Sequence, residues 1–127
     1  MELIIQKSIE LGVNAIIPVE MKRCVVKLDS KSESKKIERW QKIAESAAKQ
    51  SGRNIIPEIS HMIKVEDIIK SKNEYDSIIV CYENEKQNYI KNELLKLKSK
   101  EQVRIAVVIG PEGGLEEADV EYLKQNN

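Results

Sequence analysis

The chain is poor in the residue types on which many binding and redox sites depend. Among its 127 residues there is no Phe, one His and two Cys, and aromatic residues make up 4%. With so few aromatic rings, stacking of bases on an aromatic platform is not the expected mode of RNA capture. Cys24 and Cys81 stand far apart inside apolar runs, which excludes a zinc-binding spacing or a disulfide framework and favours two buried structural thiols.

Charge and hydropathy exclude further classes of protein. Lys and Arg together number 21 and Asp and Glu together number 21, so the net charge is zero and any contact with RNA must come from a local basic patch. No apolar segment approaches the roughly 20 residues of a membrane span, and no signal-peptide pattern opens the chain. The length is that of one domain with its own core, and a cytoplasmic location is expected.

Helical and strand-like patterns alternate along the chain, which predicts an α/β fold with a mostly parallel sheet flanked by helices. Strands are expected at 13–19, 24–28, 54–59, 77–82 and 103–109. Helices are expected at 3–11, after the capping-box spacing Ser30 to Glu33, at 65–70, around 90–97 and at 115–123. Glycines at 12 and 52 should end the first two helices, and the long second helix should bury a face that contains Ile37, Trp40, Ala44 and Ala47.

One segment combines a strand pattern with a glycine-rich loop. The aliphatic run Ile105 to Ile109 is typical of a strand buried on both faces, and it leads directly into Gly110-Pro111-Glu112-Gly113-Gly114. Ligands of parallel sheets bind at the carboxyl ends of the strands, and glycines leave backbone N–H and C=O groups open to a ligand. The next helix has acids in its first turn, which repel phosphate, and neither G-x-G-x-x-G nor G-x-x-x-x-G-K-[ST] occurs. The loop therefore suits a ligand with a cation and an adenosine but no phosphate; the alternative is a tight turn that merely needs glycine.

Four ordered segments carry a resemblance to a known family. They are Gln6 to Val13 (QKSIELGV), Arg23 to Val26 (RCVV), Glu45 to Pro57 (ESAAKQSGRNIIP) and Ile109 to Gly114 (IGPEGG). Together they resemble the small-subunit ribosomal RNA uridine-N3 methyltransferases, the RsmE-type branch of the SPOUT (α/β-knot) class. The resemblance runs over nearly the whole chain and implies an S-adenosylmethionine-dependent enzyme that methylates N3 of a uridine, without a metal, as a homodimer.

The resemblance also implies where the cofactor lies. This class holds S-adenosylmethionine in three loops at the carboxyl edge of the sheet; the glycine loop would be the second, and the first would follow the 77–82 strand. The cofactor-binding residues expected on this basis are Tyr82, Glu83, Gly110, Pro111, Glu112, Gly113 and Gly114. A loop position alone is weak evidence, because a glutamate such as Glu83 in a loop is more often a solvated carboxylate than a ligand contact.

Two arginines are the candidates for substrate binding. Arg53 follows the helix stop at Gly52, where its planar guanidinium could clamp an RNA phosphate or the uracil carbonyls, and Arg23 lies between two strand-like runs. The alternative for each is a salt bridge. The residue that removes the N3 proton is not identified: His61 is conceivable as a base, but a surface position is favoured for it.

The chain also departs from the family pattern. The family has an N-terminal PUA-like RNA-binding barrel, a first strand, and a C-terminal segment with the third cofactor loop and the knot-closing helix, none of which is matched here. Residues 1–127 are therefore expected to form a partial SPOUT methyltransferase domain that is inactive alone. The rival interpretation is a non-catalytic α/β module that dimerises or binds RNA.

Overall fold

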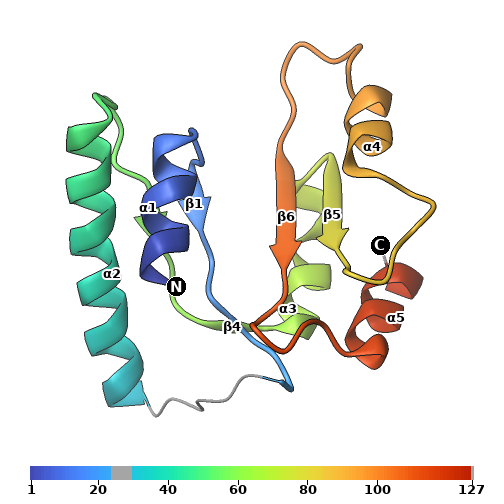
Figure 1. The fold of residues 1–127 in the computed structure, drawn as a ribbon, viewed down its shortest axis with the longest axis horizontal. Coiled ribbons are helices and arrows are strands. Elements are labelled where there is room, and N and C mark those ends of the chain that lie inside the picture. The colour runs from blue at the N-terminus through green and yellow to red at the C-terminus, as the bar shows by residue number, and fades with distance from the viewer. Residues whose placement is uncertain (24–29, 127) are drawn as a thin grey trace. The chain divides into compact units, whose positions relative to one another are not determined.

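The computed structural model describes residues 1–23 and 30–126 (Figure 1). The strand expected at 24–28 lies outside these residues. The described chain divides into two compact units, one formed by residues 1–19 and 30–63, the other by residues 20–23 and 64–126. The division falls within two short paired strands, β2 (Val19–Glu20) and β4 (Ile63–Lys64). Each unit is therefore described by itself.

The first unit is built on two helices that end in the same way. Both α1 (Glu2–Glu10) and α2 (Ser30–Gln50) are followed by a glycine in the left-handed region, Gly12 at φ 104° and Gly52 at φ 70°. The N–H groups of each glycine and of the residue after it bond back to the last turn, as in a Schellman motif. Both predicted helix ends are confirmed. The long helix is helical from Ser30 onward, so the residues of the expected capping box are already within it.

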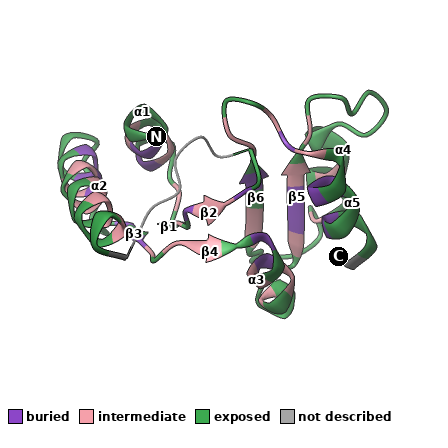
Figure 2. Ribbon diagram, turned by 90° about the horizontal axis from the view of Figure 1, so that it is seen from below, coloured by how far each residue is buried: buried purple, intermediate pink, exposed green. Residues whose placement is uncertain are grey.

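The core of the first unit joins α1, α2 and one strand. Its fully buried residues are Ile5, Ile9, Ala44, Ala47, Ala48 and Ile59. Small alanines on α2 let α1 approach closely enough for Ile5 and Ile9 to be completely enclosed. Figure 2 shows both helices with buried, purple positions among exposed, green ones. The predicted apolar face is confirmed, since Ile37 and Trp40 also pack against this core.

The strands of the first unit are shorter than predicted. In the segments expected at 13–19 and 54–59, β1 (Ala15–Ile16) and β3 (Glu58–Ile59) form and pair in parallel, and Val19 at the end of the first segment begins β2. Buried Pro18 and Pro57 lack the N–H group that a longer ladder would need. The side-chain amide of Gln41 on α2 takes the place of a strand partner here, donating to the Pro57 carbonyl at 3.2 Å and accepting from the Ile59 N–H at 2.9 Å.

The second unit contains the longest strand pair in the described chain. The two strands β5 (Ser77–Cys81) and β6 (Ile105–Ile109) pair in parallel over five residues, so that Cys81 lies opposite Ile109. The other elements of this unit are α3 (Val65–Lys70), the 3₁₀ turn η1 (Lys72–Glu74), α4 (Ile90–Lys96) and α5 (Glu117–Asn126). The parallel α/β class is confirmed, although the described strands form three separate pairs and not one continuous sheet.

The burial of β6 differs from the prediction. Val108 is buried, but the side chains of Val107 and Ile109 are 49% and 59% exposed, so the expected burial on both faces is wrong. An unbroken aliphatic run does not distinguish a strand covered on both faces from one whose second face is apolar but uncovered. The prediction that Cys81 is buried is wrong for the same reason, since this thiol lies on the exposed end of β5.

Candidate functional site

The ends of β5 and β6 open into a hollow of about 600 Å³. Its lining residues are Cys81, Tyr82, Glu83, Ile109, Gly110, Pro111, Glu112, Gly113 and Gly114. The parallel pairing of the strands brings the two loops together, because strands in register end at the same edge. All seven residues proposed from the sequence to hold a cofactor therefore line one hollow, although 26 or more positions of sequence separate the two loops.

The glycine loop is a closed turn with a buried anchor. The N–H of Gly114 donates to the carbonyl of Pro111 at 2.8 Å, and Gly114 adopts a φ of 73°, a conformation in which glycine is favoured. The next residue, Leu115, is 2% exposed. Burial of this side chain holds the loop between the end of β6 and the first turn of α5.

The three glycines of the loop are required for different reasons. A methyl group on Gly110 would come within 2.9 Å of the buried Leu115 side chain and 3.0 Å of its backbone nitrogen. A methyl group on Gly114 would overlap the carboxylate of Glu83. The backbone of Gly114 is also left-handed, a conformation that residues with a side chain rarely adopt. On Gly113 the nearest atoms would be two carbons of Arg23 at 3.8 Å, an ordinary contact. The turn itself therefore explains Gly110 and Gly114 but gives no steric reason for Gly113.

The loop after β5 supplies a carboxylate that faces the glycine loop. Glu83 lies against the α-carbon of Gly114, and within the described residues its carboxylate takes part in no hydrogen bond or ion pair. Farther along the loop, the N–H groups of Gln87 and Asn88 donate to Glu85 and hold the pKa of that carboxyl below its usual range. Glu85 also lies 3.9 Å from Lys124, so the negative charge of the hollow comes from its own lining residues Glu83 and Glu112, which suit a cationic ligand and oppose a phosphate.

Two basic residues from the segment before the undescribed residues reach the glycine loop and α5. The Arg23 guanidinium donates to the carbonyl of Gly113 at 2.8 Å and lies 3.7 Å from the Glu116 carboxylate. Lys22 lies 3.9 Å from Asp119, whose side chain is 9% exposed. Sequence reasoning identified Arg23 but missed Lys22, Leu115 and Glu116. Lys22 is the neighbour of Arg23, and the other two directly follow the glycine motif, so their positions in the sequence could have indicated them.

Arg53, the other substrate candidate, lies in the first unit and binds backbone. Its Nη1 donates to the carbonyls of Val13 at 2.6 Å and Ile9 at 3.0 Å, and the carbonyl of Gly12 lies 3.5 Å from Nη2. Among the described residues no carboxylate forms an ion pair with Arg53, so the alternative of a salt bridge is not found; the guanidinium is instead bound to backbone carbonyls. Its contact with RNA stays a prediction. His61 is exposed, as favoured.

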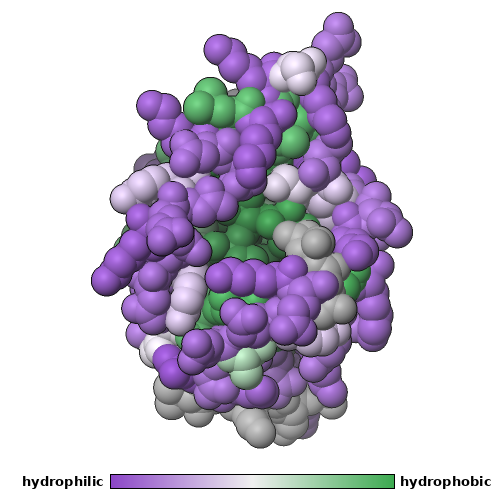
Figure 3. Space-filling model, turned by 90° about the vertical axis from the view of Figure 1, so that its right-hand side faces the viewer, coloured by the Kyte–Doolittle hydropathy of each residue, from purple (hydrophilic) through white to green (hydrophobic). Residues whose placement is uncertain are grey.

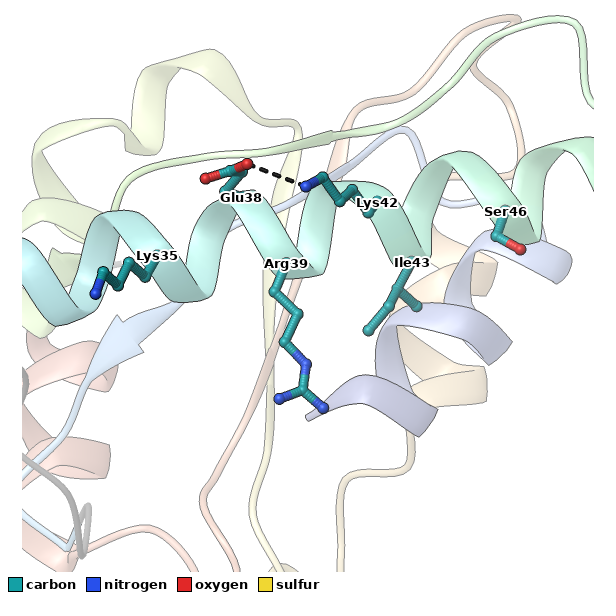
Figure 4. A pocket seen from close by; sticks show the side chains of 6 residues that line it. All are labelled: Lys35, Glu38, Arg39, Lys42, Ile43 and Ser46. Carbon is teal, nitrogen blue, oxygen red and sulfur yellow. Dashed lines mark hydrogen bonds and ion pairs between the residues drawn. The ribbon is translucent and has the colours of Figure 1, made fainter.

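A second hollow, of about 450 Å³, is lined by side chains of α2 (Figure 4). Two of its three basic side chains are paired with acids: Arg39 with Glu2 at 2.8 Å, and Lys42 with Glu38 at 3.1 Å. Exposed pairs of this kind contribute little to stability, but they neutralise part of the positive charge at this surface. The hollow therefore has less of the unpaired positive charge that an anion site would need.

Two loops at the carboxyl edge of a parallel strand pair, one of them rich in glycine, form a candidate ligand site at the sheet edge of an α/β domain. The chain belongs to the family described as RNA methyltransferase domain, whose sequence model matches residues 1–127. The resemblance to the RsmE-type branch is confirmed by its relatives.

Two of the relatives carry the same name. Ribosomal RNA small subunit methyltransferase E of Bacillus subtilis (strain 168) is 41% identical over an alignment of 129 residues, which covers 100% of this chain and 50% of that protein. The protein of the same name from Mesomycoplasma hyopneumoniae (strain 232) is 33% identical over 98% of this chain and 51% of its own length.

A solved structure agrees with the sequence relatives. The crystal structure of a ribosomal RNA small subunit methyltransferase E from Neisseria gonorrhoeae bound to S-adenosyl methionine is similar with a TM-score of 0.77 and 31% identity, over 99% of this chain and 48% of that one. The chain thus spans about half the length of the relatives it matches.

Proposed function

We propose that the hollow at the ends of β5 and β6 binds S-adenosylmethionine. The observation that carries this proposal is Gly113: packing leaves room for a side chain there, yet the residue is glycine and its backbone faces a hollow. A glycine that the turn does not require is explained by close approach of a ligand to the backbone. The solved relative from Neisseria gonorrhoeae, which was crystallised with this molecule, supports the choice of ligand.

The residues of the hollow fit this ligand in shape and charge. Bare backbone at Gly110 to Gly114 can hydrogen-bond an adenine, and the unpaired carboxylate of Glu83 can accept hydrogen bonds from ribose hydroxyls. The anionic rim favours the sulfonium cation. When bound, the cofactor supplies an activated methyl group. The protein's own part is to hold the cofactor in place and to exclude alternative orientations, which lowers the barrier to such a transfer.

The substrate proposed for the full-length protein is a uridine of small-subunit ribosomal RNA, methylated at N3. By full-length protein we mean this chain together with whatever its reading frame adds at either end. The names of the relatives support ribosomal RNA as the substrate, and the resemblance supports the uridine nitrogen. Arg53 and Arg23 remain the residues that we propose to contact the substrate. The proposed location of the protein is the cytoplasm. Among the described residues no helix is long and apolar enough to cross a membrane.

We propose further that residues 1–127 form the central part of a methyltransferase domain that works as a homodimer. The coverage of about half of each relative supports the first statement. Exposed apolar side chains support the homodimer. On α4, Ile90, Leu94 and Leu95 are 44–55% exposed. Figure 3, which views the side that carries α4 and α5, shows hydrophobic surface there. Reading the frame on both sides and measuring the mass in solution by light scattering test these statements.

Calorimetric titration of the full-length protein with S-adenosylmethionine tests the cofactor proposal. Wild type should bind, and Gly113→Ala should weaken binding by about tenfold or more. The melting temperature should stay within about 2 °C, because the protein atoms nearest to the added methyl, two carbons of Arg23, lie at an ordinary contact distance of 3.8 Å. Gln125→Ala, an exposed neutral residue of α5 outside the hollow, is the control and should bind like wild type. Equal affinity of Gly113→Ala and wild type would remove this loop from the site.

A further inference from the structure

Arg23 makes a contact that bridges ninety positions of sequence. Its Nη1 donates a 2.8 Å hydrogen bond to the carbonyl of Gly113, and its Nε lies 3.7 Å from a carboxylate oxygen of Glu116. The carboxylate holds the guanidinium from one side while the guanidinium holds the loop from the other. The side chain of Arg23 is about half exposed, so it reaches the loop from the surface.

The contact falls on the peptide unit between the two adjacent glycines of the loop. The peptide unit between Gly113 and Gly114 joins two residues without side chains, so it is the unit that can most easily rotate. Both of its polar groups are engaged: the carbonyl of Gly113 accepts from Arg23, and the N–H of Gly114 donates to Pro111 at 2.8 Å. Removing the arginine would release one of these two restraints and leave the other intact.

A second basic residue attaches the same segment to α5. Lys22 lies 3.9 Å from one carboxylate oxygen of Asp119, a residue that is 6% exposed. The other oxygen of this carboxylate is buried and has no hydrogen-bond partner within the described part of the chain. The two adjacent cations therefore both engage the segment formed by the glycine loop and the first turn of α5, and Arg23 is the one that binds the loop backbone.

We propose that Arg23 is a positioning residue that fixes the glycine loop in its ligand-binding conformation before the ligand arrives. The inference rests on the proposed binding of S-adenosylmethionine at this loop. A loop that is already ordered loses less conformational freedom on binding, so the ligand binds more tightly. The role differs from direct contact with RNA, because the hydrogen bond that defines it is made to the protein's own backbone.

The test compares Arg23→Ala and Arg23→Lys in the full-length protein. Affinity for S-adenosylmethionine is measured by calorimetry, and amide hydrogen exchange at residues 113–116 is measured without ligand. Arg23→Ala should weaken binding by about tenfold and speed exchange at the loop, with little change in melting temperature. Arg23→Lys should recover part of both, since an ammonium can still donate to the Gly113 carbonyl. Lys91→Ala, which removes one exposed charge from α4 of the same unit, is the control and should match wild type.

The outcomes separate this proposal from the cofactor proposal. Unchanged affinity and exchange in Arg23→Ala would overturn the positioning role. A fall in affinity that follows a fall in melting temperature and is not recovered by lysine would also overturn it, because that pattern indicates general structural damage. If wild type fails to bind S-adenosylmethionine, the proposed function fails, and exchange alone decides the role of Arg23: faster exchange in Arg23→Ala supports it and unchanged exchange overturns it.

Discussion

The guanidinium of Arg53 donates a 2.6 Å hydrogen bond to the backbone carbonyl of Val13, forty positions earlier in the chain. Arg53 directly follows the glycine that ends α2, and Val13 directly follows the glycine that ends α1. The end of the second helix thus caps the end of the first. The same side chain also binds the carbonyl of Ile9 in the last turn of α1, where carbonyls lack partners within the helix.

Replacement of Arg53 by Ala should destabilise the first unit. The change leaves two backbone carbonyls without their charged donor, and a hydrogen bond to a charged group contributes about 1.5–3 kcal/mol. Because the side chain is partly exposed and water can replace it, we expect a loss of about 1–3 kcal/mol in the free energy of unfolding, measured by urea titration. Arg53→Lys should recover part of the loss.

The same variant tests the substrate role that the sequence suggested. If Arg53 contacts RNA, methyl transfer by the full-length Arg53→Ala protein should fall strongly at a temperature where it is still folded, while cofactor affinity stays within a few-fold. If transfer by the folded variant equals that of wild type, the arginine acts only as a cap on α1.

Three alanine substitutions in the glycine loop should differ in cost. Gly110→Ala should cost about 1–3 kcal/mol, the usual cost of overpacking, because Leu115 is buried and its backbone nitrogen lies only 3.0 Å from the new methyl. Gly114→Ala should cost about 1–2 kcal/mol, mainly through its left-handed φ, since the exposed Glu83 side chain can move aside. Gly113→Ala should be nearly neutral for stability.

Urea unfolding of the three variants and of wild type measures these differences in the free energy of unfolding. Gly113→Ala serves as the internal control for the effect of adding a methyl group to this loop. The steric argument is contradicted if Gly113→Ala proves the most destabilising of the three.

Stability should depend on pH through Asp76, which ties the amino ends of β5 and β6. Its carboxylate accepts from Lys100 at 2.6 Å and from the Arg104 N–H at 2.8 Å, and these hydrogen bonds hold its pKa below the usual range. Because the folded pKa is lowered, the stabilisation is present above the unfolded value of about 3.9 and is lost as the pH falls through the folded pKa. Asp76→Asn should remove this part of the pH dependence.

The measurement is the urea midpoint of wild type and Asp76→Asn between about pH 7 and pH 2.5. The difference between the two proteins should be largest near neutral pH and should shrink as acid protonates Asp76 in wild type. A difference that stays constant across this range would show that the carboxylate charge is not the cause.

Ile5 should be among the most sensitive positions of the first unit. It is fully buried between α1 and α2, so Ile5→Ala should lower the free energy of unfolding by about 2–5 kcal/mol. Leu11→Ala, directly after the last residue of the same helix, is the matched control. That leucine is 88% exposed, so its loss should change stability by less than about 0.5 kcal/mol. Denaturant midpoints of the two variants settle the comparison, and similar losses for both would contradict the assignment of the core.

Much of the local structure could be predicted from the sequence, because it depends on neighbours within a few residues. The stops at Gly12 and Gly52, the bounds Val65–Lys70 of α3 and the loop that follows β6 all agree with patterns of this range. The strands at 13–19 and 54–59 were overestimated, since strand length depends on a partner and on prolines that interrupt the ladder. Exposure of Cys81 and Ile109 also depends on what covers the strands.

By itself the sequence determined which residues carry the candidate site and the order of helices and strands, because apolar periodicity, glycine and proline act on the backbone locally. Only the tertiary structure decided what those residues do. The parallel register of β5 and β6 brings the two loops into one hollow. Arg23 binds the glycine loop across ninety positions, and Arg53 binds the end of α1 across forty. A side chain that can bond to any carbonyl within reach takes its partner from the fold, and the spacing of residues along the chain does not specify it.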